Sequence, residues 1–213
     1  IKLVSIKKIN KNLKNVDSHY QNFWTEVVER SETIIYLSFN NDLSNLKENL
    51  EDSFIQNLLP LYILNNIIYK KQKKIKLIYL STATLYANNA KLPVKENSSI
   101  KINNIYEYLK FLSEQILINS NNSYLNYQIL RLSNVYGENK SKYIQKNRQV
   151  ISKVIENAFK EKEIKIFGSG NYYRDFIHVK DVSEAIFRVI CKNNIKNEVY
   201  NIGSGKKNKL IDI

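Results

Sequence analysis

Cysteine, methionine and proline are scarce in this sequence, and each shortage limits what the chain can be. The single cysteine, Cys191, excludes an internal disulfide framework and favours a reducing compartment, so we expect a cytoplasmic protein. No methionine occurs and the first residue is Ile1, which predicts a fragment or a processed chain. Because proline occurs only twice, no obvious linker divides the 213 residues.

Metal ligands and long apolar runs are also scarce. The two histidines, His19 and His178, lie far apart without metal-ligand spacing, which argues against a zinc site. The best apolar run, residues 58–69, is interrupted by Asn65 and Asn66 and is shorter than the roughly 18 residues that a membrane span needs. We therefore expect neither a metal nor a membrane span.

Positive charge is in large excess. Lys and Arg number 33 against 20 Asp and Glu, which gives a net charge of +13. Such a balance raises nucleic-acid binding as an alternative. However, the lysines are spread along the chain, and the densest run, at residues 70–74, is typical of a solvated helix end. We expect no specific nucleic-acid partner, and a general attraction for anionic ligands.

Apolar runs of strand length alternate with segments of helical period. The predicted strands are residues 3–6, 33–37, 75–80, 127–132, 164–167 and 199–202. The predicted helices are residues 23–28, 46–69, 106–118, 150–159 and 182–190, and a short apolar stretch at 13–16 precedes Asp17. Strands that are apolar on both faces predict an α/β fold in which helices cover both sides of a parallel sheet.

One tyrosine and one lysine offer acid/base chemistry. Tyr106 and Lys110 are four residues apart in a predicted helix, so their side chains face the same way. An ammonium near a phenol favours the phenolate and lowers the tyrosine pKa from about 10. Tyr106 would then move a proton near neutral pH. In isolation the pair is better explained as an exposed helix face, because the chain has 15 tyrosines and many lysines.

Hydroxyl side chains follow the predicted strand at 75–80. Ser81, Thr82 and Thr84 stand at the carboxyl end of that strand, where doubly wound sheets bind their ligands. The Thr82 hydroxyl could hydrogen-bond the same substrate oxygen that Tyr106 deprotonates. The alternative is a turn whose hydroxyls cap the next segment.

Further motifs occur in a fixed order along the chain. They read Leu-Ser-Thr-Ala-Thr-Leu-Tyr at 80–86, Leu-Arg-Leu-Ser-Asn-Val-Tyr-Gly at 130–137, Arg-Asp-Phe-Ile-His-Val-Lys-Asp-Val at 174–182 and Tyr-Asn-Ile-Gly-Ser-Gly at 200–205. With Tyr106-x-x-x-Lys110, these segments resemble the extended short-chain dehydrogenase/reductases, especially their NAD-dependent epimerase/dehydratase group. The resemblance covers nearly the whole chain.

This resemblance implies a Rossmann-like doubly wound parallel sheet. Residues 1–137 would form the NAD(P)-binding Rossmann domain, and residues 138–213 a partial substrate-binding region, of which 176–203 return to the Rossmann core. The Gly-rich phosphate loop that follows the first strand of this fold does not occur in the sequence. We therefore expect the chain to begin near the second strand, and its substrate region to be cut short after Ser204.

The resemblance also implies roles for individual residues. Tyr106 would be the acid/base, Lys110 would bind the nicotinamide ribose and tune Tyr106, and Thr82 would orient the substrate hydroxyl. The cofactor would be NAD; NADP is an alternative that Lys7 and Lys8 would suit. The residues implied to line the cofactor are Asp17, Leu37, Ser38, Asn57, Ser81, Tyr106, Lys110 and Ser133. Those implied to hold a nucleotide-diphosphate sugar are Thr82, Asn134 and Arg174, whose guanidinium fork suits phosphate oxygens.

Several of the motif residues could also have plain structural roles. Asn134 could close a turn, and Asp175 is better explained as pinning a loop than as a chemical group. Asp181 would cap a helix, and Gly203 and Gly205 would form a tight turn.

Epimerisation of the sugar by transient hydride transfer is the reaction that the resemblance favours. Family 4,6-dehydratases carry Asp-Glu after the catalytic threonine, whereas Ala83 and Thr84 follow Thr82 here. A reductase or dehydratase of the same family stays an alternative. So does a degenerate, non-catalytic Rossmann module, because Tyr36 and Ala87 depart from the family's histidine and glycine. Family members often dimerise through helices that include the catalytic one, which implies a homodimer.

Overall fold

The central feature of the computed structural model is a sheet of four parallel strands. The structure describes residues 13–40, 48–87, 89–137, 150–160, 163, 170, 172–192 and 196–212, although not every side chain within them. The strands follow the order β1-β2-β3-β7, and all neighbouring pairs are parallel. Their bounds are Thr33–Tyr36 (β1), Ile75–Thr82 (β2), Leu125–Leu132 (β3) and Glu198–Ile202 (β7). The predicted parallel sheet is thus confirmed.

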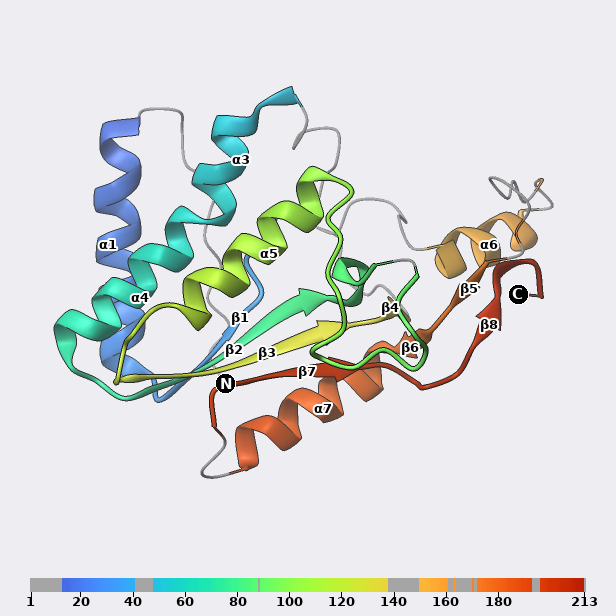
Figure 1. Cartoon of the computed structure of the whole chain (residues 1–213). Helices are drawn as coiled ribbons and strands as arrows, with labels where there is room; N and C mark the ends of the chain where they lie inside the picture. The colour runs from blue at the N-terminus through green and yellow to red at the C-terminus, as the bar shows by residue number, and fades with distance from the viewer. Residues whose placement is uncertain are drawn as a thin grey trace.

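Helices cover both faces of this sheet (Figure 1). One face carries α1 (Leu13–Arg30), α3 (Leu50–Asn57), α4 (Leu59–Lys71) and α5 (Ile105–Ile118). The other face carries α7 (Val179–Cys191). This layering follows from strands whose side chains are buried on both faces, since each face needs an apolar cover.

Smaller elements lie beyond the carboxyl ends of β2 and β3 (Figure 1). β4 (Asn134–Tyr136) pairs in parallel with β6 (Phe176–His178), and β5 (Tyr173–Arg174) pairs antiparallel with β8 (Asn208–Lys209). The remaining elements are the helix α6 (Val150–Phe159) and two 3-10 turns, η1 (Ala83–Leu85) and η2 (Leu210–Asp212).

The hydrophobic core fills the space between the sheet and the α1–α4 side. Leu61, Leu64 and Ile68 are fully buried and recur at helical spacing along one face of α4. They belong to one cluster with Leu77 of β2 and Ile129 of β3, which are also fully buried. Burying a side chain of this size stabilises the fold by roughly 1.5–3 kcal/mol, so this cluster fixes the sheet on which the site is built.

Four predicted elements need correction or cannot be compared. The helix α1 begins at Leu13, so the apolar stretch at 13–16 and the helix predicted at 23–28 are one continuous element. The helix predicted at 46–69 is two helices that meet at Leu58, because Pro60 cannot donate a hydrogen bond inside a continuous helix. The strands predicted at 3–6 and 164–167 lie outside the described residues. The other predicted helices and strands are confirmed to within a few residues.

Candidate functional site at the carboxyl end of β2

Thr82 ends β2 and presents its hydroxyl at the edge of the sheet. Its Oγ1 accepts a hydrogen bond from the backbone N–H of Thr84 at 3.2 Å and lies 3.1 Å from the Thr84 hydroxyl. The hydroxyl therefore does cap the following turn, as the structural alternative predicted. It also lies close enough to the phenol of Tyr106 to favour the phenolate and lower its pKa, so it serves the turn and stands beside the candidate acid/base as well.

Tyr106 stands in the first turn of α5, and the sequence fixes where that helix begins. The side chain of Asn104 caps the helix by accepting from the N–H of Glu107 at 3.0 Å. In return, the Glu107 carboxylate accepts from the N–H of Asn103 at 2.7 Å. This reciprocal arrangement is that of a capping box, shifted by one residue at its start. It holds the Tyr106 phenol in place beside Thr82.

Burial raises the pKa of the Tyr106 phenol, and the nearby hydroxyl of Thr82 opposes this rise without cancelling it. The nearby charge of Glu107 raises the pKa further. The predicted lowering by Lys110 is therefore wrong for this arrangement of side chains. The reason is geometric, because the Lys110 ammonium is directed elsewhere.

Lys110 is almost fully buried, with 7% of its surface exposed. Its Nζ donates to the carbonyl oxygen of Leu80 at 2.7 Å. It also lies 3.9 Å from the ring centroid of Phe39 and 4.9 Å from that of Tyr79. Burial lowers the pKa of Lys110 to about 7, although the charge of Glu114 acts in the opposite direction. Its ammonium is thus in contact with two aromatic rings and one backbone carbonyl.

Phe39 is a site residue that the sequence analysis missed. Its ring meets the ring of Tyr106 edge-to-face, at 5.6 Å between centroids and 88° between planes. Phe39 therefore contacts both members of the Tyr106–Lys110 pair. The available signal was its position, since it follows Leu37 and Ser38 at the carboxyl end of β1, where ligand contacts were already expected.

The residues expected to line a cofactor divide into exposed and buried ones. Leu37 is 59% exposed, and Ser38 is partly exposed beside it. Asn57 is fully buried, and its amide accepts from the N–H of Asn40 at 2.7 Å and donates to the carbonyl of Ser53 at 2.9 Å. The structure thus brings Leu37 and Ser38, but not Asn57, to the surface of the site.

Two further candidate cofactor contacts are Ser81 of β2 and Asp17 of α1. Ser81 is buried, and its hydroxyl donates to Glu114 at 2.5 Å, so it faces the interior of the protein. Adjacent strand residues point to opposite faces, which accounts for the contrast with Thr82. Asp17 lies in α1, and its side chain is outside the described part.

Asp175 organises the turn after β7. Its carboxylate accepts from the N–H of Ser204 and of Gly205, both at 2.9 Å, and from the Ser204 hydroxyl at 2.7 Å. Ser133 donates to the same carboxylate at 3.4 Å, and Asn134 donates its side-chain amide to the Asp175 carbonyl at 3.0 Å. The prediction that Asp175 pins a loop is confirmed, and Ser133 and Asn134 are tied to that loop.

Arg174 and Asp181 differ from Asp175 in their surroundings. Arg174 is exposed on β5, where it donates to the carbonyl of Tyr173 at 3.0 Å and lies over the ring of Tyr172. The structure does not bring it into contact with Thr82 or Tyr106. Asp181 does not cap α7, because the side chain of His178 accepts from the N–H of Lys180 at the cap position.

The described ranges hold neither a metal-ligand cluster nor a membrane helix. Among those residues, no three or more His, Cys, Asp or Glu side chains come together as they would to hold a metal ion. No helix within them has both the length and the apolar character to cross a membrane.

The layered parallel sheet, with a threonine–tyrosine–lysine cluster at the carboxyl end of a central strand, defines a Rossmann-like α/β protein. The family model described as "NAD dependent epimerase/dehydratase family" matches residues 4–203. The chain therefore belongs to this NAD-dependent family of epimerases and dehydratases, and the fold and family implied by the sequence motifs are both confirmed.

Individual relatives include both epimerases and dehydratases. A Methanocaldococcus jannaschii protein with the provisional name UDP-glucose 4-epimerase is 38% identical over 143 residues, which are 65% of this chain and 45% of that protein. The mouse dTDP-D-glucose 4,6-dehydratase is 28% identical over 200 residues, covering 92% of this chain and 54% of the enzyme.

A solved structure gives the same assignment. The UDP-glucose 4-epimerase of Thermotoga maritima, solved with UDP-glucose, matches with a TM-score of 0.77 and 25% identity over 92% of this chain and 63% of its own. This chain thus spans roughly half to two thirds of these relatives.

Proposed function

We propose that this chain forms the catalytic part of an NAD-dependent epimerase that acts on a nucleotide-diphosphate sugar. The observation that carries the proposal is the proximity of Thr82, at the end of β2, to Tyr106 of α5, with the buried Lys110 one turn further along that helix. These three groups meet where a doubly wound sheet binds its ligands. They supply a proton donor and acceptor, a second hydroxyl and a cation.

In this proposal each of the three residues has a distinct task. Tyr106 takes a proton from a sugar hydroxyl and returns it, as a general base and then a general acid. Thr82 hydrogen-bonds the same sugar oxygen and so directs the proton to Tyr106. Lys110 holds the nicotinamide ribose, and its positive charge favours the phenolate once the ammonium turns toward Tyr106.

The described residues fit a nicotinamide nucleotide. An ammonium has three N–H groups, and the one hydrogen bond described for Lys110 goes to Leu80, so donors are left for ribose hydroxyls. Leu37 and Ser38 offer an open strand end next to it. When bound, NAD would supply a hydride acceptor and donor for the sugar carbon. In the same proposal Ser133 lines the cofactor, and Asn134 and Arg174 hold the diphosphate of the substrate.

Epimerisation is favoured over dehydration by the residues after Thr82. Removal of water from a sugar needs an additional acid and base, and neither Ala83 nor Thr84 has a carboxyl group. Epimerisation needs no side chains beyond the three described above, which would act together with NAD. A reductase of the same family is the second candidate, because it would use the same three residues.

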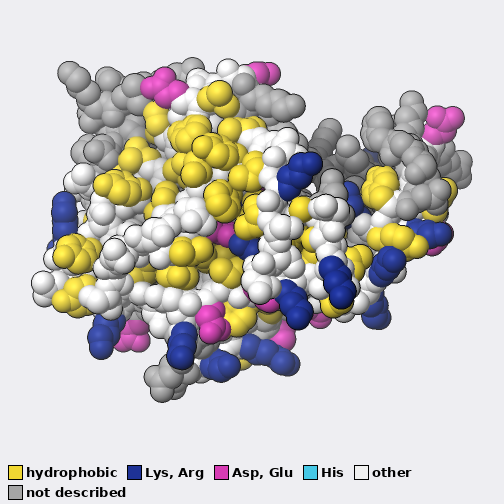
Figure 2. Space-filling view, in the orientation of Figure 1, with side chains coloured by type: hydrophobic (Ala, Val, Ile, Leu, Met, Phe, Trp, Pro, Cys, Tyr) yellow, Lys and Arg dark blue, Asp and Glu magenta, His cyan; other side chains and the backbone are white. Residues whose placement is uncertain are grey.

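A homodimer and a cytoplasmic location complete the proposal. Exposed apolar side chains gather over the α3–α5 side of the molecule (Figure 2). The exposed large hydrophobic residues of these helices include Tyr62 and Tyr69 of α4 and Tyr108 of α5. A patch of this kind is suited to a subunit interface. Tyr69→Glu should therefore convert a dimer into a monomer in sedimentation experiments, and a monomeric unchanged protein would rule the interface out. The exposed thiol of Cys191 suits a reducing compartment.

The reaction can be tested with substrate deuterated at the sugar carbon. The gene product that contains this chain is incubated with NAD and a panel of UDP-, GDP- and dTDP-sugars, and products are identified by NMR. We expect one sugar to be converted to its C4 epimer with the deuterium retained at C4, because the same hydride is removed and returned. No epimer from any sugar, or loss of the deuterium to water, would contradict the proposal.

A further inference from the structure

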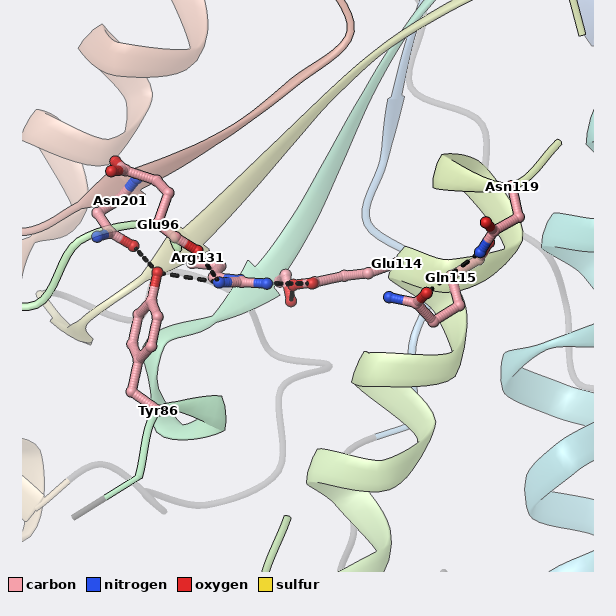
Figure 3. Close-up of polar contacts among 8 residues, drawn as sticks. Tyr86, Glu96, Glu114, Gln115, Asn119, Arg131 and Asn201 are labelled. Carbon is pink, nitrogen blue, oxygen red and sulfur yellow. Dashed lines mark hydrogen bonds and ion pairs between the residues drawn. The ribbon is translucent and has the colours of Figure 1, made fainter. Parts of the chain in front are cut away.

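A buried ion pair lies directly behind the candidate site. Glu114 of α5 and Arg131 of β3 are joined by two hydrogen bonds, at 3.0 Å from Nε to Oε1 and 2.7 Å from Nη2 to Oε2 (Figure 3). Their side chains are 0% and 4% exposed, respectively. This two-point geometry fixes the carboxylate and the guanidinium in both distance and orientation.

The carboxylate of this pair connects the two elements that carry the candidate catalytic residues. Glu114 follows Lys110 by one helical turn, so both side chains project from the same face of α5. Its Oε1 also accepts from the hydroxyl of Ser81, the residue before Thr82 in β2. One carboxylate is therefore tied to the helix of Tyr106 and Lys110 and to the strand of Thr82.

The guanidinium extends these ties to the segment that leads into α5. Nη1 of Arg131 donates to the hydroxyl of Tyr86 at 3.0 Å and to the carbonyl of Glu96 at 3.1 Å. The Tyr86 hydroxyl in turn donates to Asn201 of β7 at 2.5 Å, and the Glu96 carboxylate accepts from the Asn201 N–H at 2.9 Å (Figure 3). Arg131 thus holds the segment before α5 as well as the body of that helix.

Charge gives the pair a second effect on the site. The titratable groups around Lys110 are Tyr79 of β2, whose ring lies under the ammonium, Glu114 of α5, whose charge acts on it, and Tyr106, which precedes it by one turn of α5. Burial raises the pKa of both tyrosines, so both are neutral at pH 7. Among the described residues, Glu114 is the group whose charge favours the protonated form of Lys110.

Stability alone is a poor explanation for such a pair. Desolvating two charges costs about as much as their attraction returns, so well-packed apolar side chains would stabilise the same space equally well. Breaking the pair would instead leave one buried charge without a partner. The pair is therefore expected to matter for the geometry and charge of the site.

We propose that Glu114 and Arg131 are positioning residues for the Thr82–Tyr106–Lys110 centre. The pair holds α5 in register with β2 and β3, and the carboxylate supplies negative charge to the buried ammonium. The inference rests on the proposed function, because a positioning role presupposes that these three residues act together. Neither Glu114 nor Arg131 contacts the reacting atoms in this account.

The test follows the protonation of Lys110 directly. The gene product is labelled with ¹³C at lysine Cε, and the resonance of Lys110 is assigned by its loss in Lys110→Met. This resonance should titrate with a midpoint of about 7, well below the usual value of about 10.4 for a lysine side chain in water. In Glu114→Gln the midpoint should fall by about one pH unit or more, because the opposing charge is gone. Glu184→Gln, which breaks the exposed Glu184–Arg188 pair, should leave the midpoint unchanged.

Kinetics provide a second readout for the same variants. At pH 7 Glu114→Gln should lower kcat by about tenfold or more with a small change in KM, because the reacting groups are misplaced while the substrate contacts remain. The loss should be smaller at lower pH, where more Lys110 is protonated. Glu184→Gln should behave like the unchanged protein.

A second variant covers the case in which Glu114→Gln does not fold. Glu114→Leu combined with Arg131→Met removes both charges and keeps an apolar filling. An unchanged Lys110 midpoint in a folded variant of either kind would overturn the proposal. Failure of both variants to fold would also overturn it, because it would show that the role of the pair is purely structural. The Lys110 titration midpoint is measured without substrate, so it does not depend on the proposed reaction. An active Tyr106→Phe variant would contradict the proposed function, whereas the Lys110 midpoint in Glu114→Gln would still test the positioning role.

Discussion

The ring of Phe39 lies over the ammonium of Lys110, with 3.9 Å between Nζ and the ring centroid. The same ring touches Tyr106 at its edge. A side chain from the end of β1 therefore covers Lys110 and Tyr106, the polar groups of the candidate site. Any ligand group that reaches Lys110 from this side must first displace Phe39.

Removing this ring should make Lys110 easier to protonate. Burial is the main cause of the low pKa of Lys110, and Phe39→Ala would admit water to the ammonium. We expect the ¹³C titration midpoint to rise from about 7 by about one pH unit. Phe54→Ala is the matched control, because Phe54 makes a similar edge contact with Tyr108 elsewhere on α5. Equal midpoints in Phe39→Ala and the unchanged protein would contradict the inference that the Phe39 ring shields Lys110 from water.

The same low pKa makes folding stability depend on pH. The pKa of Lys110 is about 7 when folded and about 10.4 when unfolded, so between these values the unfolded chain binds one more proton. The free energy of unfolding should therefore rise with pH across this window, by roughly 1 kcal/mol per unit from this residue.

Denaturant unfolding at pH 7.5 and 9 would measure this slope. Lys110→Met should remove the Lys110 contribution, whereas Lys71→Met, at an exposed site, should retain it. The prediction fails if the unchanged protein and Lys110→Met show the same slope.

Two neighbouring residues of α5 should differ widely in their contribution to stability. Leu117 is fully buried in the core, whereas Ile118 is 40% exposed. Leu117→Ala should lower the free energy of unfolding by about 2–5 kcal/mol, and Ile118→Ala by less than about 1 kcal/mol. Trp24, the single tryptophan and a buried one, provides the fluorescence signal. Similar losses in the two variants would mean that α5 presents a different face to the sheet.

Gly203 should tolerate no larger residue while Asp175 is present. A Cβ atom at position 203 would lie 2.6 Å from Oδ2 of Asp175, closer than two such atoms can approach. Gly203→Ala should lower the free energy of unfolding by about 1–3 kcal/mol. In a double-mutant cycle with Asp175→Ala the two losses should be less than additive, because the clash disappears with the carboxylate. Fully additive losses would exclude this contact.

The sequence predicted the sheet well because its strands are buried on both faces. Continuous apolar runs such as residues 75–80 and 127–132 are typical of the central strands of a parallel sheet. The common orientation of Tyr106 and Lys110 was also predictable, since helix geometry fixes residues four apart on one face. These are local rules, and they hold wherever the element itself forms.

Other features depend on tertiary packing, which local patterns do not describe. The cover by Phe39 comes from another strand end, and burial, not the charge of Lys110, is the main cause of the raised pKa of Tyr106. The break at Leu58 interrupts a helical period that continues on both sides of it. The inward direction of Ser81 was predictable, because neighbouring strand residues alternate between faces, but the sequence did not show that Glu114 would be its partner.

Replacement of the Tyr106 hydroxyl tests the central claim most directly. Tyr108→Phe is the matched control, because Tyr108 lies on the same helix with an exposed side chain. In the NMR assay with the sugar that the gene product converts, Tyr106→Phe should lose about a hundredfold or more in kcat and still bind NAD, while Tyr108→Phe stays fully active. If Tyr106→Phe turns over as fast as Tyr108→Phe, Tyr106 is not the acid/base of this protein.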